Sequence, residues 1–321
     1  MTVLVMSDSD IRDVLDMESC IAAMENVLAA LARGELTMPL RFMFRPSDDQ
    51  LLGLMPAHRA GDAPVFSLKE IVVTPANGPR GIDPHQGAVL LHDGTNGFLS
   101  AILNASAITE IRTAAVSGVA TKLLARDGAR RVAIVGAGVQ ARSHAHAMRT
   151  VIDDPELRIW SRTRAHAEAL ALESHAVACE TAEEALDGAD VVCVCTSSHE
   201  PVVRRAWLAP GAHVNAVGAH GPTARELDGD VVADSAFFVD LRESALNESG
   251  DYALAAQEHG FGPEHILAEL GELLLGAHPG RRSDDELTVF KSLGIAVEDL
   301  AAASLCVDRA RERGVGAEVA F

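Results

Sequence analysis

The stretch RVAIVGAGVQARSHAHAM, residues 131–148, decides the fold class. Its first five residues form an apolar run typical of a buried strand, and the Ala-rich residues from 139 onward are typical of a helix. Gly136, Gly138 and Ala141 give the pattern G-x-G-x-x-A at the turn. A strand, a glycine turn and a helix in this order predict the dinucleotide-binding turn of a Rossmann fold.

Each residue type in this turn suits pyrophosphate. Gly136 permits the tight turn, Gly138 lets the backbone approach the phosphates, and Ala141 allows the helix to pack closely on the strand. We expect the amides of Val139 and Gln140, at the helix N-terminus, to point at the anion. A tight turn that binds no nucleotide is the alternative.

The chain around this turn alternates between apolar runs and helical or loop segments. Such alternation predicts a parallel, doubly wound sheet with helices as crossovers. The expected strands are 131–135, 158–160, 176–179, 190–196, 213–217 and 237–241.

The preceding region has a different character. Residues 8–34 show helical periodicity that stops at Gly34, and short strand-like runs broken by turns such as DGTNG follow. These runs predict a largely antiparallel sheet, so this region is of α+β type. A long helix pattern over 106–128 leads into the glycine turn, and another, at 290–314, is expected to pack back on the first domain.

Composition excludes several classes of protein. At 321 residues, 48% hydrophobic and 23% charged, the chain has enough apolar residues for two globular domains. A net charge of −19 argues against nucleic acid as a partner, because phosphate binding needs a basic face. No secretion signal or membrane-spanning run is evident, which favours the cytoplasm. The five cysteines, odd in number and widely spaced, are expected to be buried free thiols.

The end of the second Rossmann strand predicts the dinucleotide. NAD sites usually place a carboxylate there for the ribose 2′-hydroxyl, but this chain has RIWSRTR at 158–164. Hydroxyls and guanidiniums suit a 2′-phosphate, because the planar Arg fork binds phosphate in a bidentate way. We therefore expect NADP(H) to be preferred and NAD(H) to be possible, with solvated arginines as the alternative. The residues concerned are Ser161, Arg162, Thr163 and Arg164.

Several motifs resemble the ornithine cyclodeaminase/mu-crystallin family over nearly the full chain. The most specific are EIRTAA, just before the glycine turn, and FKSLG…DLA, after the last strand. The others are MPLR (38–41), LMPA (54–57), SLKEIVVTPAN (67–77), LLHDGTNGFLSAIL (90–103) and VNAVGAHGPTARELD (214–228).

The resemblance implies a Rossmann domain inserted in an α+β substrate and dimerisation domain. The expected boundaries are 1–115, completed by 296–321, for the substrate domain and 116–295 for the Rossmann domain. Family members act on α-amino acids and their imines with NAD(P), so the resemblance implies a small amino-acid or imino-acid substrate and a homodimer. Those similar to mu-crystallin favour NADPH.

The resemblance also implies site residues. Arg41, Lys69 and Arg112 match the positions that hold the substrate carboxylate and polarise the reacting group, and Lys69 and Asp228 would manage the proton on nitrogen. Met55 and Thr113 would form walls of the pocket. Loops lining the cofactor would include Thr196, Ser197, Ser198, Gly218 and Gly294.

One departure from the family motifs indicates which activity to expect. Cyclodeaminases carry a glutamate before LMP for the distal amine of the substrate, whereas this chain has Gly53, although Asp48 or Asp49 could substitute. We therefore rank an NADPH-dependent imine reductase or amino-acid dehydrogenase above a cyclodeaminase that recycles NAD internally. A mu-crystallin-like binding protein is the alternative from another class. No metal is implied, since His144 and His146 point to different faces of a helix.

Overall fold

The computed structural model describes residues 2–47 and 50–321. The chain divides into unit 1, Met1–Arg112 with Gly294–Phe321, and unit 2, Thr113–Leu293. These divisions lie within three residues of the expected boundaries, and the first falls inside helix α3 (Ala105–Leu124).

Unit 1 is built on one eight-stranded sheet in the order β16-β1-β7-β6-β5-β4-β2, with β3 paired to β4. Neighbours from β2 to β7 are antiparallel, as predicted, whereas β1 runs parallel to β7. Its elements are β1 (Thr2–Met6), α1 (Asp8–Val14), α2 (Met17–Ala32), β2 (Leu36–Thr37), β3 (Phe42–Ser47), β4 (Gln50–Arg59), β5 (Val65–Val73), the 3-10 helix η1 (Pro75–Arg80), β6 (His85–Asp93), β7 (Leu99–Asn104), α11 (Ala296–Arg313) and β16 (Ala317–Ala320).

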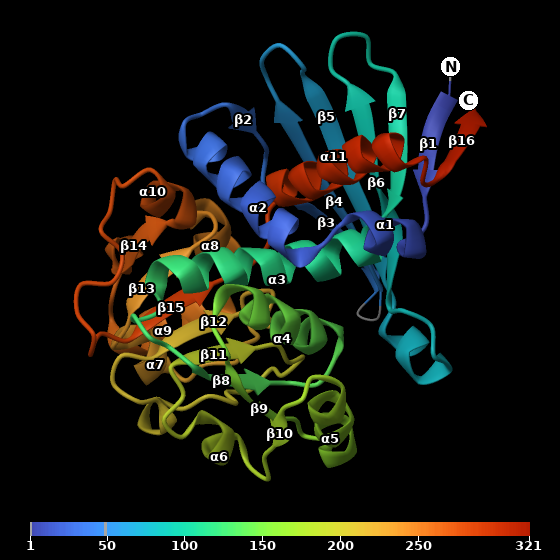
Figure 1. The fold of residues 1–321 in the computed structure, drawn as a ribbon. Helices are drawn as coiled ribbons and strands as arrows, with labels where there is room; N and C mark the ends of the chain where they lie inside the picture. Colours follow the sequence, from blue (N-terminus) through green and yellow to red (C-terminus); the bar gives the residue numbers. More distant parts are fainter. Residues whose placement is uncertain (1, 48–49) are drawn as a thin grey trace. The chain divides into compact units, whose positions relative to one another are not determined.

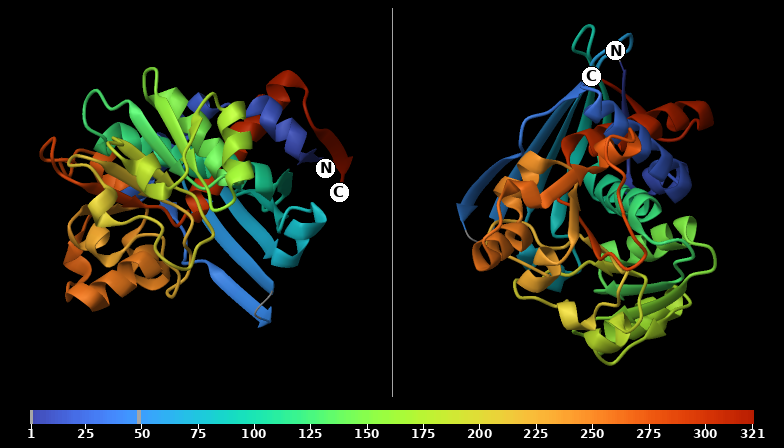
Figure 2. Two further views of the ribbon diagram at one scale, coloured as in Figure 1. Left: turned by 90° about the horizontal axis from the view of Figure 1, so that it is seen from below. Right: turned by 90° about the vertical axis from the view of Figure 1, so that its left-hand side faces the viewer.

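The two ends of the described chain lie together in unit 1, because β16 pairs antiparallel with β1 (Figure 2). Helix α11 packs against β4, β5 and β6 and lies beside α2 (Figure 1). The return of this helix to the first domain is as predicted, but the strand that follows it was not.

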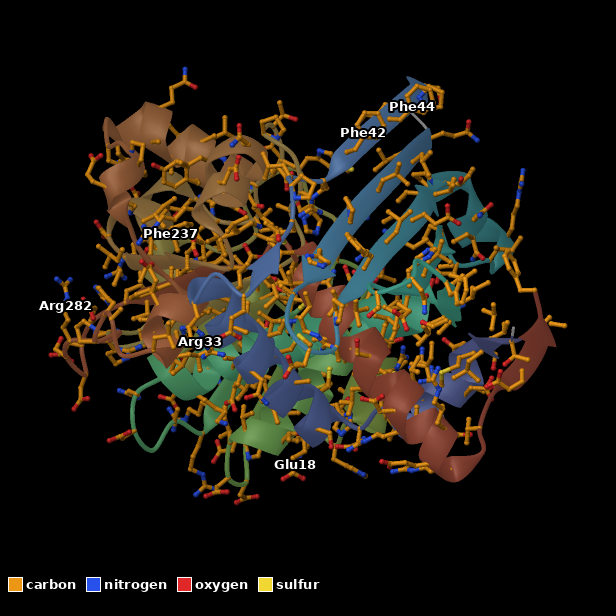
Figure 3. All side chains as sticks on the ribbon, turned by 90° about the horizontal axis from the view of Figure 1, so that it is seen from above. Glu18, Arg33, Phe42, Phe44, Phe237 and Arg282 are labelled. Carbon is orange, nitrogen blue, oxygen red and sulfur yellow. The ribbon has the colours of Figure 1, made fainter. Side chains whose placement is uncertain are left out.

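The pleat gives the unit 1 sheet two unlike faces. Ladder pairing puts Met55 of β4, Lys69 of β5 and Val89 of β6 side by side, and all three are buried. Alternate residues point the other way, and there Phe42, Phe44, Phe66 and Val72 are 44–59% exposed. Figure 3 shows Phe42 and Phe44 extending from β3. The face on which Lys69 lies is thus the interior of unit 1.

Residues 8–34, where the periodicity predicts helix, form two helices, α1 and α2. Ser7 caps α1, which ends at Val14, and the Asp16 side chain then accepts a hydrogen bond from the Ser19 amide at 2.8 Å to start α2. This second cap sets a new helix start within an unbroken apolar pattern.

Unit 2 contains an all-parallel sheet in the order β10-β9-β8-β11-β12-β15-β13-β14. Its elements are β8 (Arg131–Val135), α4 (Val139–Val151), β9 (Glu156–Trp160), α5 (Arg164–Glu173), β10 (Val177–Ala178), α6 (Ala182–Leu186), β11 (Val191–Val194), η2 (Arg205–Trp207), β12 (His213–Ala216), α7 (Gly229–Ala233), β13 (Ala236–Val239), α8 (Arg242–Glu248), α9 (Gly250–His259), η3 (Pro263–His265), β14 (Ile266–Glu269), α10 (Leu270–Leu274) and β15 (Thr288–Lys291).

The doubly wound prediction is confirmed. All six expected strands are present, whereas β14 and β15 were not anticipated. The strand order reverses between β8 and β11, and ligands of such sheets bind outside the carboxyl ends of the strands at this switch point. Apart from the exposed Arg131, the residues of strands β8, β11, β12 and β13 are buried, and most of them are apolar, as expected for a sheet covered on both faces.

Two further predictions concern side chains and membrane spans. All five cysteines are free and buried, as predicted. Among the described residues, no helix combines the length and apolar character needed to cross a bilayer.

Candidate active site

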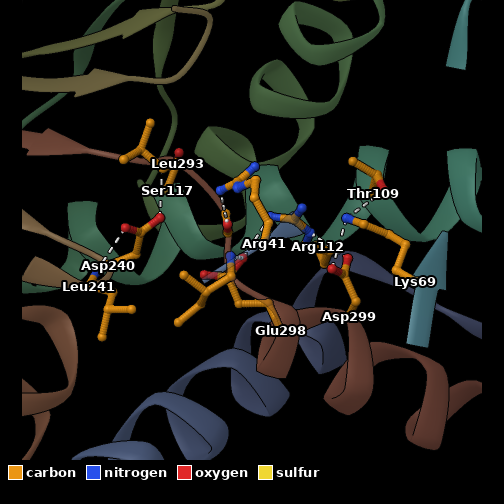
Figure 4. Close-up of polar contacts among 12 residues, drawn as sticks. Arg41, Lys69, Thr109, Arg112, Ser117, Asp240, Leu241, Leu293, Glu298 and Asp299 are labelled. Carbon is orange, nitrogen blue, oxygen red and sulfur yellow. Dashed lines mark hydrogen bonds and ion pairs between the residues drawn. The ribbon is translucent and has the colours of Figure 1, made fainter. Parts of the chain in front are cut away.

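Unit 1 gathers the three predicted cations around two acidic residues of α11. Lys69 is 2% exposed, and its Nζ lies 2.8 Å from Asp299 Oδ2 and 3.4 Å from the Thr109 hydroxyl (Figure 4). The guanidinium of Arg112, on α3, donates from Nε to Asp299 Oδ1 at 2.9 Å and from Nη1 to Glu298 Oε2 at 2.6 Å. Asp299 therefore bridges Lys69 and Arg112.

Gly294 connects this arrangement to Arg41. Its carbonyl accepts a hydrogen bond from Arg41 Nη2 at 2.7 Å. Its φ is +71°, and a Cβ at this position would collide with the Arg112 guanidinium. Gly294 was predicted to line the cofactor, and within unit 1 it lies against both predicted substrate arginines.

Together Arg41, Lys69, Arg112, Glu298 and Asp299 form what we call the charged cluster. Its three cations and two carboxylates leave one net positive formal charge. Burial lowers the pKa of Lys69 to about 8 although Asp299 opposes the shift, so the amine is mostly charged at neutral pH. Burial alone would raise the pKa of Asp299, but the Arg112 and Lys69 charges outweigh it and hold that pKa below its usual value. A small monoanion such as a carboxylate would balance the cluster.

The predicted pocket walls are both buried. Met55 is directly opposite Lys69 in the β4–β5 ladder, so its side chain shares the inner face with the amine. Thr113 follows Arg112 on α3 and is the first residue of unit 2 in the division above. Asp48 and Asp49, the suggested substitutes for the missing glutamate, lie outside the described residues.

The glycine turn of unit 2 leaves its backbone open at the start of α4. Gly136 has a φ of +122°, and a Cβ there would collide with the Cys195 carbonyl at the end of β11. Gly138 caps α4, and no described atom lies within 4 Å of where its Cβ would be, so a ligand oxygen can approach this backbone. The first turn of α4, which includes Val139 and Gln140, has no acidic residue, and Ala141 is fully buried. These residues fit a dinucleotide phosphate.

The two predicted phosphate-binding arginines, which both follow β9, differ in their surroundings. Arg164 starts α5, where its Nε lies 2.8 Å from Glu168 Oε1 and its Nη1 pairs with Glu180. Two carboxylates therefore already engage its guanidinium. Arg162 and Thr163 are exposed and Ser161 is half-buried.

Asp228 occupies a capping position in unit 2. Its Oδ1 accepts from the Val231 amide at 2.9 Å, as the N-cap of α7, and its Oδ2 accepts from the Arg205 amide at 3.1 Å. Both oxygens thus hold local backbone. Its acid–base role stays a prediction.

Glu226, two residues earlier in the same RELD motif, was missed. This carboxylate is fully buried, and its oxygens accept from the Thr196 amide and hydroxyl and from the Gly218 and Ala219 amides. It thus joins two of the segments that were predicted to line the cofactor, whereas Ser197 is exposed between Thr196 and Ser198.

A family model matches residues 1–314, and its description is the ornithine cyclodeaminase/mu-crystallin family. The chain belongs to this family. The ketimine reductase mu-crystallin of Mus musculus is 39% identical over 310 residues, which cover 94% of this chain and 96% of the relative. The resemblance inferred from the motifs is therefore confirmed.

Two solved structures share the fold over the whole length. The Delta(1)-pyrroline-2-carboxylate reductase of Thermococcus litoralis, in complex with NADH and L-proline, has a TM-score of 0.93 at 34% identity and covers 99% of this chain and 100% of its own. An archaeal alanine dehydrogenase dimer with bound NAD has a TM-score of 0.94 at 30% identity, and all of both chains is covered. These relatives are oxidoreductases, and the two solved structures contain NADH or NAD.

Proposed function

We propose that this chain is an NADPH-dependent reductase that converts the C=N group of an α-imino acid to CH–NH. The charged cluster carries the proposal, because it brings Arg41, Lys69 and Arg112 together, and two guanidiniums beside an ammonium suit a small carboxylate. Relatives named as a ketimine reductase and a pyrroline-2-carboxylate reductase support the imine as the reacting group. The reverse reaction is the oxidation of an α-amino acid by NADP. An α-amino acid carries the same carboxylate as the imine, so the same cluster would bind it.

In this proposal the residues of the charged cluster have different roles. Arg41 and Arg112 hold the substrate carboxylate and fix the α-carbon. Lys69, with a pKa of about 8, is the acid that protonates the imine nitrogen, because it is charged at neutral pH yet gives up its proton more easily than an ordinary lysine. Met55 supplies the apolar wall beside it. Asp228 remains a proposed second proton-handling group.

The dinucleotide belongs at the carboxyl edge of the unit 2 sheet. Gly136, Gly138 and the first turn of α4 would hold its pyrophosphate. When bound, the reduced nicotinamide supplies the hydride. Preference for NADPH rests chiefly on Arg162, since Arg164 already pairs with Glu168 and Glu180. The NADH and NAD in the solved relatives keep NAD(H) as the alternative.

Position 53 favours reduction over cyclodeamination. Gly53 lies two residues before Met55 on the inner face, and a Cβ there would contact Ile71 and Met43 at 3.4 Å. These apolar neighbours offer nothing to bind an ammonium group. A substrate with a distal amine, such as ornithine or lysine, therefore gains no partner at this position.

We also propose that the chain forms a homodimer through the outer face of the unit 1 sheet. Phe42, Phe44, Phe66 and Val72 are large apolar side chains exposed on that face around Glu70, and exposed apolar side chains gathered on one face mark protein interfaces. The archaeal relative described as a dimer supports a second copy as the occupant.

The deciding experiment measures oxidation of NADPH by purified protein with a panel of cyclic and linear α-imino acids. We expect turnover with at least one imine, and loss of at least about 100-fold in kcat for Lys69→Met, in line with removal of a general acid. Lys122→Met, on an exposed turn of α3, is the matched control and should retain activity. Proline formed from ornithine without net change in cofactor would instead identify a cyclodeaminase, and cofactor binding without any turnover would identify a binding protein.

A further inference from the structure

Glu226 joins the ends of two neighbouring strands of the cofactor sheet. Its Oε1 accepts from the Thr196 amide and the Thr196 hydroxyl, both at 2.7 Å. Its Oε2 accepts from the Gly218 amide at 2.6 Å and the Ala219 amide at 2.9 Å. Thr196 follows β11 and Gly218 follows β12, so one carboxylate ties the two segments at the carboxyl edge of the sheet.

The tie extends to the neighbouring Thr196–Ser198 segment. The Thr196 hydroxyl, which donates to Glu226, accepts from the Ser198 amide at 3.1 Å. Any side chain at Gly218 would collide with the Thr196 carbonyl, so the two segments are in close contact. A shift of Glu226 would therefore move backbone along this whole edge.

A buried ion pair between Lys291 and Asp251 supports the backbone of Glu226. Asp251, on α9, accepts from the Glu226 amide at 2.8 Å and from the Leu227 amide at 3.0 Å. Lys291, at the end of β15, lies 2.9 Å from Asp251 and donates to the Ala219 carbonyl at 2.8 Å. Lys291 and Asp251 are the charged groups that act most strongly on Glu226, and the Cys195 thiol after β11 also interacts with it.

We propose that Glu226 is a positioning residue for the dinucleotide: its ionised carboxylate aligns the segments after β11 and β12, and the cofactor binds tightly only while that alignment holds. This inference rests on the proposed function in one respect, namely that the cofactor binds at this edge.

Protonation weakens this tie for a geometric reason. A proton on Oε2 would meet the Gly218 and Ala219 amide hydrogens that are aimed at that oxygen, and a proton on Oε1 would make the Thr196 hydroxyl rotate from donor to acceptor. In either case the charged acceptor that joins the two segments is lost. Burial raises the pKa of Glu226 to about 7, and the nearby Lys291 only partly offsets it, so the change falls near neutral pH.

Cofactor affinity should depend on the protonation of Glu226. The carboxylate is present above pH 7 and is lost as pH falls, so cofactor affinity should decline toward acid. Because one proton is involved, the dissociation constant should rise by at most tenfold per pH unit below about pH 7. By linkage, binding near pH 7 should release a proton.

NADH is the probe for the test, since NADPH carries a 2′-phosphate that itself titrates near pH 6. We would measure NADH dissociation constants from pH 5.5 to 8.5 for wild type, Glu226→Gln and Glu269→Gln. Glu269 is the matched control, because it is a partly buried carboxylate at the end of the edge strand β14 that also accepts a backbone amide. We expect the wild type and Glu269→Gln to weaken toward acid, and Glu226→Gln to bind at least about tenfold more weakly at pH 8 with no pH dependence.

A second pair of variants keeps the test decisive if Glu226→Gln fails to fold. Thr196→Val removes one of the four donors and should weaken NADH and move the pH midpoint upward, whereas Thr196→Ser retains the hydroxyl and should behave as wild type. A flat wild-type profile, or the same slope in Glu226→Gln, would overturn the inference. Binding of NADH without reduction of any imine would refute the proposed substrate and leave the role of Glu226 standing; no binding of either dinucleotide would refute both.

Discussion

The ion pair between Lys69 and Asp299 predicts how the activity should depend on pH in the alkaline range. If Lys69 must be charged to protonate the imine, kcat/KM should fall above pH about 8, where this amine loses its proton. Asp299→Asn removes the negative charge 2.8 Å from Nζ, while burial and the charges of Arg112 and Arg41 still disfavour the ammonium. Loss of one adjacent opposite charge typically moves a pKa by about 1–3 units.

The magnitude follows from the protonated fraction of Lys69. A pKa lowered from about 8 by 1–3 units reduces that fraction by roughly 3- to 200-fold at about pH 7.5. Asparagine can still accept the hydrogen bond from Arg112 Nε, so the arginine should remain in place. Activity of Asp299→Asn should therefore recover at lower pH, which a misfolded variant could not do.

The assay is the pH profile of imine reduction for wild type, Asp299→Asn and Glu298→Gln. Glu298 pairs with Arg112, whereas Asp299 is the carboxylate that pairs with Lys69 Nζ, so the Glu298 variant should keep an alkaline limb close to that of the wild type. An unmoved limb in Asp299→Asn, or an equal displacement in Glu298→Gln, would refute Lys69 as the proton donor.

Three further predictions use other parts of the molecule. Arg162→Ala should weaken NADPH roughly 10- to 100-fold and leave NADH unchanged, since one charge-assisted bond is worth about 1.5–3 kcal/mol, whereas Arg164→Ala should change either titration by much less. Gly294→Ala should lower imine kcat/KM at least about tenfold with NADPH affinity retained, because the added methyl displaces the Arg112 guanidinium; normal kinetics would contradict the contact. Phe44→Glu should yield monomers in sedimentation experiments, while Leu172→Glu, at an isolated and 82% exposed position on α5, should not.

Local sequence was sufficient for some features and insufficient for others. The glycine turn of unit 2 depends on neighbouring residues, so its pattern predicted both the strand and the helix. The partners of Arg112 come from α11, 186 and 187 residues away, and no local pattern shows which acidic residues will reach a given cation. Strand β15 (Thr288–Lys291) was missed because its last two residues were assigned to the helix pattern at 290–314, whereas the helix itself begins only at Ala296.

The RELD motif shows that the sequence did not predict which of two acidic residues is buried. Glu226 and Asp228 are both acidic, and family resemblance favoured Asp228. The structure places Glu226 in a fully buried pocket of four donors and Asp228 at a half-buried helix cap. Which of two neighbouring acids becomes buried depends on the path of the backbone, which composition does not encode.

Because α11 completes unit 1, the order of synthesis separates the members of the charged cluster. Asp299 follows Arg112 by 187 residues, a delay of about 10–40 s at ordinary translation rates. Until then Lys69 and Arg112 have no Glu298 or Asp299 to pair with, and the inner face of the sheet lacks its covering helix. Unit 2 is continuous in the chain and is fully synthesised first. A ribosome that stops between the two would release a nascent protein with a whole nucleotide-binding domain, an uncovered sheet and two unneutralised cations, which is the kind of product that chaperones and proteases recognise.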